Sequence, residues 1–262
     1  MKKKVITWII PAALGIALLG LWEFSVVHFQ IAPYILPAPS GIGAAFVENF
    51  SSLLASLWRT LYITMTAFLF AVVGGVAIAV LFTQSRIFEF ALYPYAVILQ
   101  VTPVVAIAPL ILIWVGFERI NVALIMIAWI VAFFPILSGT TQGLKSADHN
   151  LIDLFRLHGA SRWKILKRLQ FPTALPNLLG AMKVSGGLAL IGAVVAEFVA
   201  GSGTSTGLAW RIVEAGNRLQ IAKMFAALAL LAFLGISIFA VLSLLEWALL
   251  HRWHESALEK QK

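Results

Sequence analysis

Six long apolar segments constrain this chain more than any other feature of its sequence. A helix of about 20 apolar residues spans the hydrocarbon core of a bilayer, and it satisfies all of its backbone hydrogen bonds internally, as that environment requires. The sequence therefore predicts an all-α, polytopic membrane protein with six transmembrane helices. The expected spans are residues 5–27, 58–82, 91–117, 120–141, 177–199 and 221–250.

Composition supports this class and argues against several others. Hydrophobic residues make up 61% of the chain and charged residues only 11%, whereas soluble domains carry about 25% charged residues. There is no cysteine, and the five histidines are scattered, so no metal site is predicted. No nucleophile stands beside a recognisable base, and no nucleotide-binding motif is found. We therefore predict no catalytic residue and no enzyme.

The positions of lysine and arginine predict the orientation of the spans. The net charge of +8 is carried mainly by short loops, which indicates membrane orientation rather than binding of nucleic acid. An even number of spans places both termini on one side, together with the basic segment 145–176. Because cytoplasmic loops are enriched in lysine and arginine, we expect that side to be the cytoplasm. We expect residues 5–27 to be an uncleaved anchor and residues 1–262 to form one transmembrane domain.

Residues 145–176 form a polar loop between two spans, with its own helix signals. Ser146, Asp148 or Asn150 can cap a first short helix, and Gly159 can end it, since glycine accepts the left-handed conformation. Ser161 can then cap a second helix. The pattern predicts a basic helix-turn-helix that a soluble partner can reach. The alternative is an amphipathic pair that lies on anionic headgroups.

The same loop resembles the EAA loop of ABC importer permeases. Asp153-Leu154-Phe155 stands at the place of Glu-Ala-Ala, Gly159 has the family spacing, and residues 169–172 (Leu-Gln-Phe-Pro) stand for Ile-x-Leu-Pro. In that family the first short helix is the coupling helix, which sits in a groove of a cytoplasmic ATPase. The resemblance implies a set of ATPase-coupling residues: Asp153, Leu154, Phe155, Gly159, Ala160, Ser161, Leu169 and Pro172.

Two further segments are similar to the nitrate, taurine and alkanesulfonate branch of these permeases. They are Leu36 to Ser40 and Ala196 to Val199, and the resemblance extends from about Leu36 to Leu250. It implies an importer subunit in a bacterial inner membrane that works by alternating access. The implied partners are a second copy of the chain, ATPase subunits that bind ATP and Mg, and an extracytoplasmic solute-binding protein. No cofactor is expected in this chain itself.

The sequence leaves the cargo and the source of energy open. Sulfonates, nitrate and small heterocycles such as vitamin precursors all agree with the resemblance. A secondary transporter without an ATPase and a membrane scaffold or sensor subunit are the alternative functions, although neither explains a coupling-type loop.

Charged and polar residues near the spans give further expectations. For Glu197, near the outer end of a span, two interpretations stay open: a gate or partner contact, or a helix-end carboxylate in headgroup water. Lys183 is expected to snorkel to the cytoplasmic interface, and Glu246 to be paired or interfacial. We also expect short surface helices in the loops 32–57 and 201–220, the first capped by Ser40.

Overall fold

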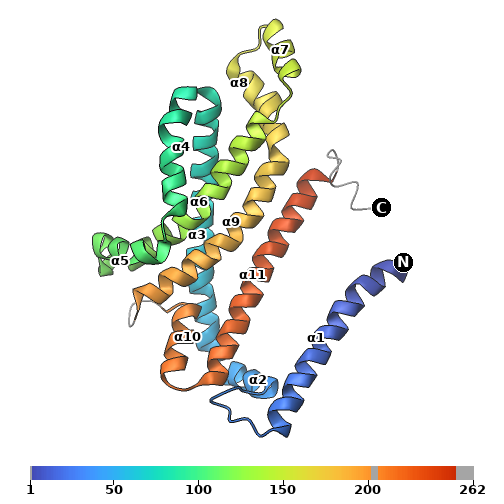
Figure 1. The fold of residues 1–262 in the computed structure, drawn as a ribbon, viewed down its shortest axis with the longest axis vertical. Coiled ribbons are helices and arrows are strands. Elements are labelled where there is room, and N and C mark those ends of the chain that lie inside the picture. Colours follow the sequence, from blue (N-terminus) through green and yellow to red (C-terminus); the bar gives the residue numbers. More distant parts are fainter. Residues whose placement is uncertain (1, 202–205, 252–262) are drawn as a thin grey trace. The chain divides into compact units, whose positions relative to one another are not determined.

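The computed structural model describes residues 2–201 and 206–251, and all regular elements within these ranges are helices (Figure 1). The chain divides into two compact units: residues 1–58 with 206–232, and residues 59–205 with 233–262. We call them unit 1 and unit 2. The C-terminus, with its predicted cytoplasmic location, lies outside the described residues. The organisation of 1–262 as one domain stays a prediction.

Unit 1 contains two short helices in addition to parts of three long ones. The short helices are α2 (Pro39–Glu48) and α10 (Leu208–Asn217), so each of the two loops contains a short helix as predicted. Their location at the membrane surface stays a prediction. The long helices are α1 (Lys2–His28), the beginning of α3 (Phe50–Gln84) and the beginning of α11 (Ile221–Leu250).

The predicted cap at Ser40 is wrong, because α2 begins one residue earlier at Pro39. Proline suits the first helical position, where its fixed φ is helical and its missing N–H would have no intrahelical partner. Ser40 instead donates twice to the carboxylate of Glu23 in α1, from its backbone N at 3.0 Å and from Oγ at 2.7 Å. A side chain of another helix thus satisfies one of the first N–H groups of α2.

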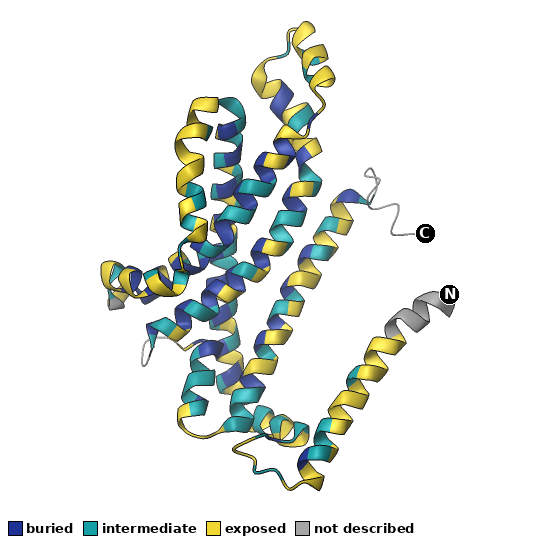
Figure 2. Ribbon diagram, viewed as in Figure 1, coloured by how far each residue is buried: buried dark blue, intermediate teal, exposed yellow. Residues whose placement is uncertain are grey.

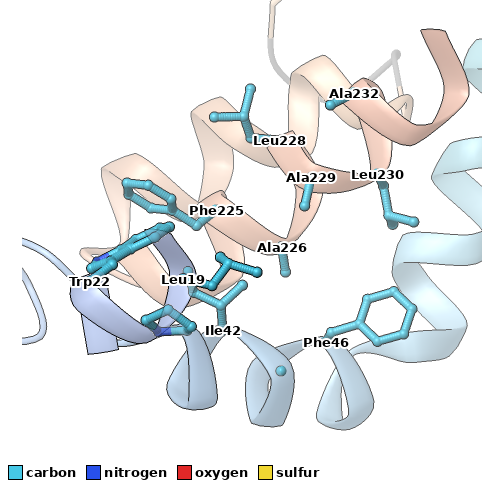
Figure 3. Close-up of a pocket in the computed structure, with 12 residues that line it drawn as sticks. Leu19, Trp22, Ile42, Phe46, Phe225, Ala226, Leu228, Ala229, Leu230 and Ala232 are labelled. Carbon is cyan, nitrogen blue, oxygen red and sulfur yellow. The ribbon is translucent and has the colours of Figure 1, made fainter. Parts of the chain in front are cut away.

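An apolar groove of about 640 Å³ lies within unit 1, between α1, α2 and the beginning of α11 (Figure 3). Trp22 of α1 and Phe225 of α11 meet at one wall, with ring centroids 5.8 Å apart. Leu19, Ile42 and Phe46 add further apolar surface. Walls of this chemistry agree with the transmembrane assignment of α1 and α11, since hydrocarbon replaces water around spanning helices.

Unit 2 is built on two long helices that pack side by side, α6 (Ile120–Lys145) and α9 (Phe171–Ala200) (Figure 1). Glycines allow this approach. A Cβ atom added to Gly192 would lie 2.8 Å from Cα of Ala128, and one added to Gly143 would lie 2.9 Å from Cα of Ala174. Contacts this short admit only hydrogen, so small residues decide the distance between the helices, as is common in membranes.

The third predicted span is not one continuous helix. Residues 91–117 divide into α4 (Arg86–Val101) and α5 (Val104–Val115), which are bent by 103° at the break. Pro103 has no N–H to continue the ladder, and its ring pushes Thr102 to extended geometry (φ −69°, ψ 125°). Five described helices are long and apolar enough to span a membrane, or six if the bent pair counts as one span.

An ion pair inside unit 2 joins two of the charged residues. Nζ of Lys183 in α9 lies 2.5 Å from Oε2 of Glu246 in α11. The expected reach of Lys183 to the cytoplasmic interface stays a prediction. Both side chains are largely buried, at 21% and 23% exposure. Pairing lowers the cost of keeping the two charges away from water. Glu246 is therefore paired, as predicted.

Candidate functional site

The loop between α6 and α9 contains the predicted short helix, α7 (His149–Leu157), with both ends closed by local hydrogen bonds. Asp148 is the N-cap, and its carboxylate accepts from the backbone N of Asn150 at 2.8 Å. At the other end Gly159 has φ +69°. The N–H of Gly159 donates to Arg156 O at 2.9 Å, and the N–H of Ala160 donates to Phe155 O at 3.0 Å. This pair of bonds is a Schellman motif, so Gly159 ends α7 as predicted.

Ser161 begins the second helix of the loop, also as predicted. Its Oγ accepts from the backbone N of Lys164 at 3.3 Å, at the start of α8 (Arg162–Ile165). A π-helical turn, η2 (Leu166–Gln170), then leads into α9, so that the helix runs without a break. Pro172 follows directly, at the beginning of α9. The widened turn agrees with a proline at this point, since the ring would crowd the carbonyl four residues back in a regular α-helix.

α7 has an exposed apolar row, and most of its ribbon is coloured as exposed in Figure 2. Leu151, Leu154 and Leu157 are 43%, 48% and 85% exposed, at a spacing of three residues along the helix. Asp153 is also exposed, and it forms an ion pair with Arg156 at 3.0 Å. Because no residue of α7 is buried, the helix contributes little to the core of unit 2. A surface of this kind is available to a partner.

The structure gathers all eight predicted coupling residues in one loop. Asp153, Leu154 and Phe155 lie on α7, where Phe155 is half-buried. Gly159, Ala160 and Ser161 form the turn and the next cap, Leu169 is half-buried in η2, and Pro172 is exposed at the beginning of α9.

Glu197 lies near the other end of α9 from Pro172. At a rise of about 1.5 Å per residue, the two residues are about 40 Å apart along the helix axis. It is fully buried, and its Oε1 accepts from Thr60 Oγ1 of α3 at 2.8 Å. The interpretation as a carboxylate exposed to headgroup water is therefore wrong. Sequence reasoning did not identify Thr60 as its partner, although Thr60 and Thr64 place two hydroxyls one turn apart in an apolar span.

Within the described ranges, no three histidine, cysteine, aspartate or glutamate side chains lie close enough together to hold a metal ion.

Comparisons with known proteins agree with this geometry. Residues 71–251 match the family model described as "Binding-protein-dependent transport system inner membrane component". The riboflavin transport system permease protein of Chloroflexus aurantiacus is 34% identical over 91% of this chain and 88% of its own length. The formylaminopyrimidine transport permease protein of Halalkalibacterium halodurans is 31% identical over 92% and 94%.

A third relative is the putative aliphatic sulfonates transport permease protein of Bacillus subtilis, which is 28% identical over 97% of this chain and 91% of its own length. Among solved structures, an inward-facing conformation of the MetNI methionine ABC transporter gives a TM-score of 0.63 at 21% identity, over 76% of this chain and 96% of that one. That likeness shows a shared fold. The chain belongs to the inner-membrane permease components of binding-protein-dependent ABC transport systems, which are not themselves catalytic.

Proposed function

We propose that this chain moves a small solute into the cytoplasm by alternating access, and that a separate ATPase drives it through α7. The observation that carries the proposal is a helix that is capped at both ends, buries none of its residues and exposes a row of three leucines. Such a helix is stable locally yet leaves its apolar row for a partner. Membership of the permease family makes an ABC ATPase the partner that fits.

The rest of the assembly follows from the same proposal. ATP and Mg bind to the ATPase subunits, a second copy of this chain completes the pathway, and an extracytoplasmic solute-binding protein delivers the cargo. Both termini and the α7–α8 loop face the cytoplasm, which the distribution of lysine and arginine supports. An impermeant thiol reagent checks this orientation, because a single cysteine at Ser161 should react only after the cells are opened.

We propose a small heterocycle as the cargo, in preference to a sulfonate or nitrate. Two of the more similar relatives are named for riboflavin and formylaminopyrimidine, at 34% and 31% identity. The cation of Lys183 within α9 is already bound to Glu246 and so is not free for an anion. Binding of riboflavin, pyrimidines, taurine and nitrate to the cognate solute-binding protein tests this choice, and tight binding of taurine or nitrate alone contradicts it.

We also propose that Glu197 is a gate residue. A fully buried carboxylate is costly, and its bond to Thr60 joins α9 to α3, so a movement between these helices would change its surroundings. Glu197→Gln keeps the size and the acceptor oxygen but removes the charge. We expect it to reduce uptake without lowering thermal stability. If uptake and thermal stability both fall in this variant, Glu197 has a structural role only.

Reconstitution tests the central proposal. The permease in liposomes with its ATPase and solute-binding protein should take up cargo when ATP is supplied, whereas the permease alone should show neither ATP hydrolysis nor uptake driven by a proton or sodium gradient. Gradient-driven uptake in the absence of every ATPase would show a secondary transporter instead. Uptake in neither arm, with correctly inserted protein, would favour a scaffold or sensor.

A further inference from the structure

A polar pocket of about 450 Å³ lies within unit 2, where the turn between α3 and α4 meets the α7–α8 loop. Three arginines line it, and none of its lining residues is acidic. Arg86 begins α4, Arg156 lies on α7 and Arg162 begins α8. One arginine from the α3–α4 turn and two from the α7–α8 loop, some 70 residues further along the chain, thus line one pocket.

Two of these arginines have no acidic partner. Arg156 is paired with Asp153, but within residues 2–201 and 206–251 no carboxylate lies within ion-pair distance of Arg86 or Arg162. Nη1 of Arg162 reaches only a backbone carbonyl, that of Gln84, at 3.5 Å, the outer limit of a hydrogen bond. Most donors of the two guanidinium groups are therefore available. Planar, forked donors of this kind match the oxygens of a phosphate.

An apolar surface begins directly beside the pocket. Ile87, Phe88 and Phe90 of α4 are 80%, 51% and 76% exposed, so the beginning of the helix presents apolar side chains to its surroundings. Figure 2 shows this end of the ribbon mostly as exposed. In a membrane protein such side chains meet hydrocarbon. The pocket therefore combines a cationic end with an apolar flank, which is the chemistry of a ligand with an anionic head and apolar tails.

We propose that this pocket binds the phosphate-bearing headgroup of an anionic phospholipid, with the acyl chains along the exposed face of α4. Basic pockets beside cytoplasmic helix ends are typical sites for such headgroups. An acidic surface of the ATPase would satisfy the arginines but would not account for the apolar flank. Because Arg156 belongs to α7, the lipid connects the coupling helix to the α3–α4 turn and makes coupling depend on anionic lipid. This inference rests on the proposed cytoplasmic orientation and goes beyond the proposed function.

Native mass spectrometry of the purified permease tests the site without any ATPase. The wild type should retain phosphatidylglycerol in preference to phosphatidylcholine with the same acyl chains. The double variant Arg86→Gln with Arg162→Gln should lose this retention about 25-fold, since each basic residue near a headgroup contributes about fivefold. The matched control is Lys167→Gln with Arg168→Gln, which removes the same charge from exposed residues of the same loop outside the pocket. Because neither residue lines the pocket, this control should reduce retention much less than the double variant does.

The single variants keep the test decisive if the double variant unfolds, because each should still weaken retention of phosphatidylglycerol about fivefold. Equal retention of the two lipids, or an equal loss in the control, would overturn the proposal. So would displacement of the lipid by millimolar inorganic phosphate, which would indicate a site for the free anion. Weakened ATPase association with unchanged lipid retention would indicate a protein contact. The lipid measurements need no ATPase, so they remain valid if ATP-driven uptake is not observed. The proposed function and the proposed lipid site can therefore be rejected independently.

Discussion

The short helices α7 and α10 have 9 and 10 residues and end in the same backbone turn, but different residue types occupy that turn. The left-handed position is Gly159 after α7, with φ +69°, and Leu219 after α10, with φ +56°. In both turns the residue after the left-handed position donates its N–H to the carbonyl five residues before it. The two distances are 3.0 Å for Ala160 to Phe155 and 2.8 Å for Gln220 to Ala215. The left-handed conformation costs a leucine about 1–2 kcal/mol and costs glycine almost nothing.

The difference follows from what holds each helix. α10 has three buried residues, Leu208, Ala209 and Ala215. Within unit 1, Nε of Arg211 also donates to the buried Ser56 Oγ at 3.0 Å. α7 has no fully buried residue and relies on its cap at Asp148 and on Gly159. A helix with buried residues of its own tolerates an unfavourable end. A helix that presents its apolar row to a partner needs ends that are specified locally.

Gly159→Val should have the largest effect of the substitutions at these two helix ends. A β-branched residue in the left-handed region costs about 2 kcal/mol, which lowers the population of the intact turn about 30-fold. We expect ATPase association and ATP-dependent uptake to fall by a similar factor, while insertion and thermal stability stay near wild type. Gly159→Asn is the control, since asparagine accepts this conformation. Wild-type coupling in the valine variant would remove α7 from the mechanism.

Arg211→Gln tests the contacts that hold α10. Loss of the bonds to Ser56 and Glu214 (2.7 Å) should cost about 1.5 kcal/mol and lower the thermal midpoint by about 3–6 °C. The hydrogen bond from Arg211 holds the pKa of Glu214 below its usual value. The ionised carboxylate of Glu214 therefore stabilises the fold at a pH above its usual pKa. This stabilisation is lost as the pH falls through the lowered pKa of Glu214. The variant should lose the larger part of this acid dependence, since Arg218 still pairs with Glu214 at 3.0 Å. Melting curves at neutral and acidic pH measure the change. An unchanged midpoint would show that packing alone holds α10.

The comparison also shows which features a sequence can reveal. The turn at Gly159, the caps at Asp148 and Ser161 and the long apolar spans have local causes, so local patterns predict them. Leu219 carries no such signal, because leucine is not a residue type that favours the left-handed region. The bond between Thr60 and Glu197 joins residues 137 positions apart, and the pattern of either helix alone does not indicate it. The sequence predicted residues 91–117 as one span, and the 103° bend at Pro103 was not predicted, since local rules do not give the angle between two helices.

Asp148→Ala should have a smaller effect on the same helix. It removes the carboxylate that accepts from Asn150 N, and losing an N-cap costs about 1 kcal/mol. Amide exchange over the first turn of α7 should accelerate about fivefold, with only a slight loss of coupling. Asp148→Asn retains an acceptor and should resemble the wild type. Unchanged exchange in the alanine variant would mean that a contact outside the loop fixes α7.

Leu219→Asn should have the smallest effect, and in the opposite direction. Asparagine occupies the left-handed region at lower cost than leucine, and the leucine side chain is 73% exposed, so little packing is lost. We expect unit 1 to gain about 0.5 kcal/mol, seen as a small rise in the thermal midpoint. Leu219→Ala is the control, because it shortens the side chain but keeps the Cβ that causes the strain, and it should give no gain. A higher thermal midpoint in both variants would trace the effect to the exposed apolar surface of Leu219. A higher midpoint in the asparagine variant alone would show that the end of α10 carries backbone strain, which the other interactions of the helix outweigh.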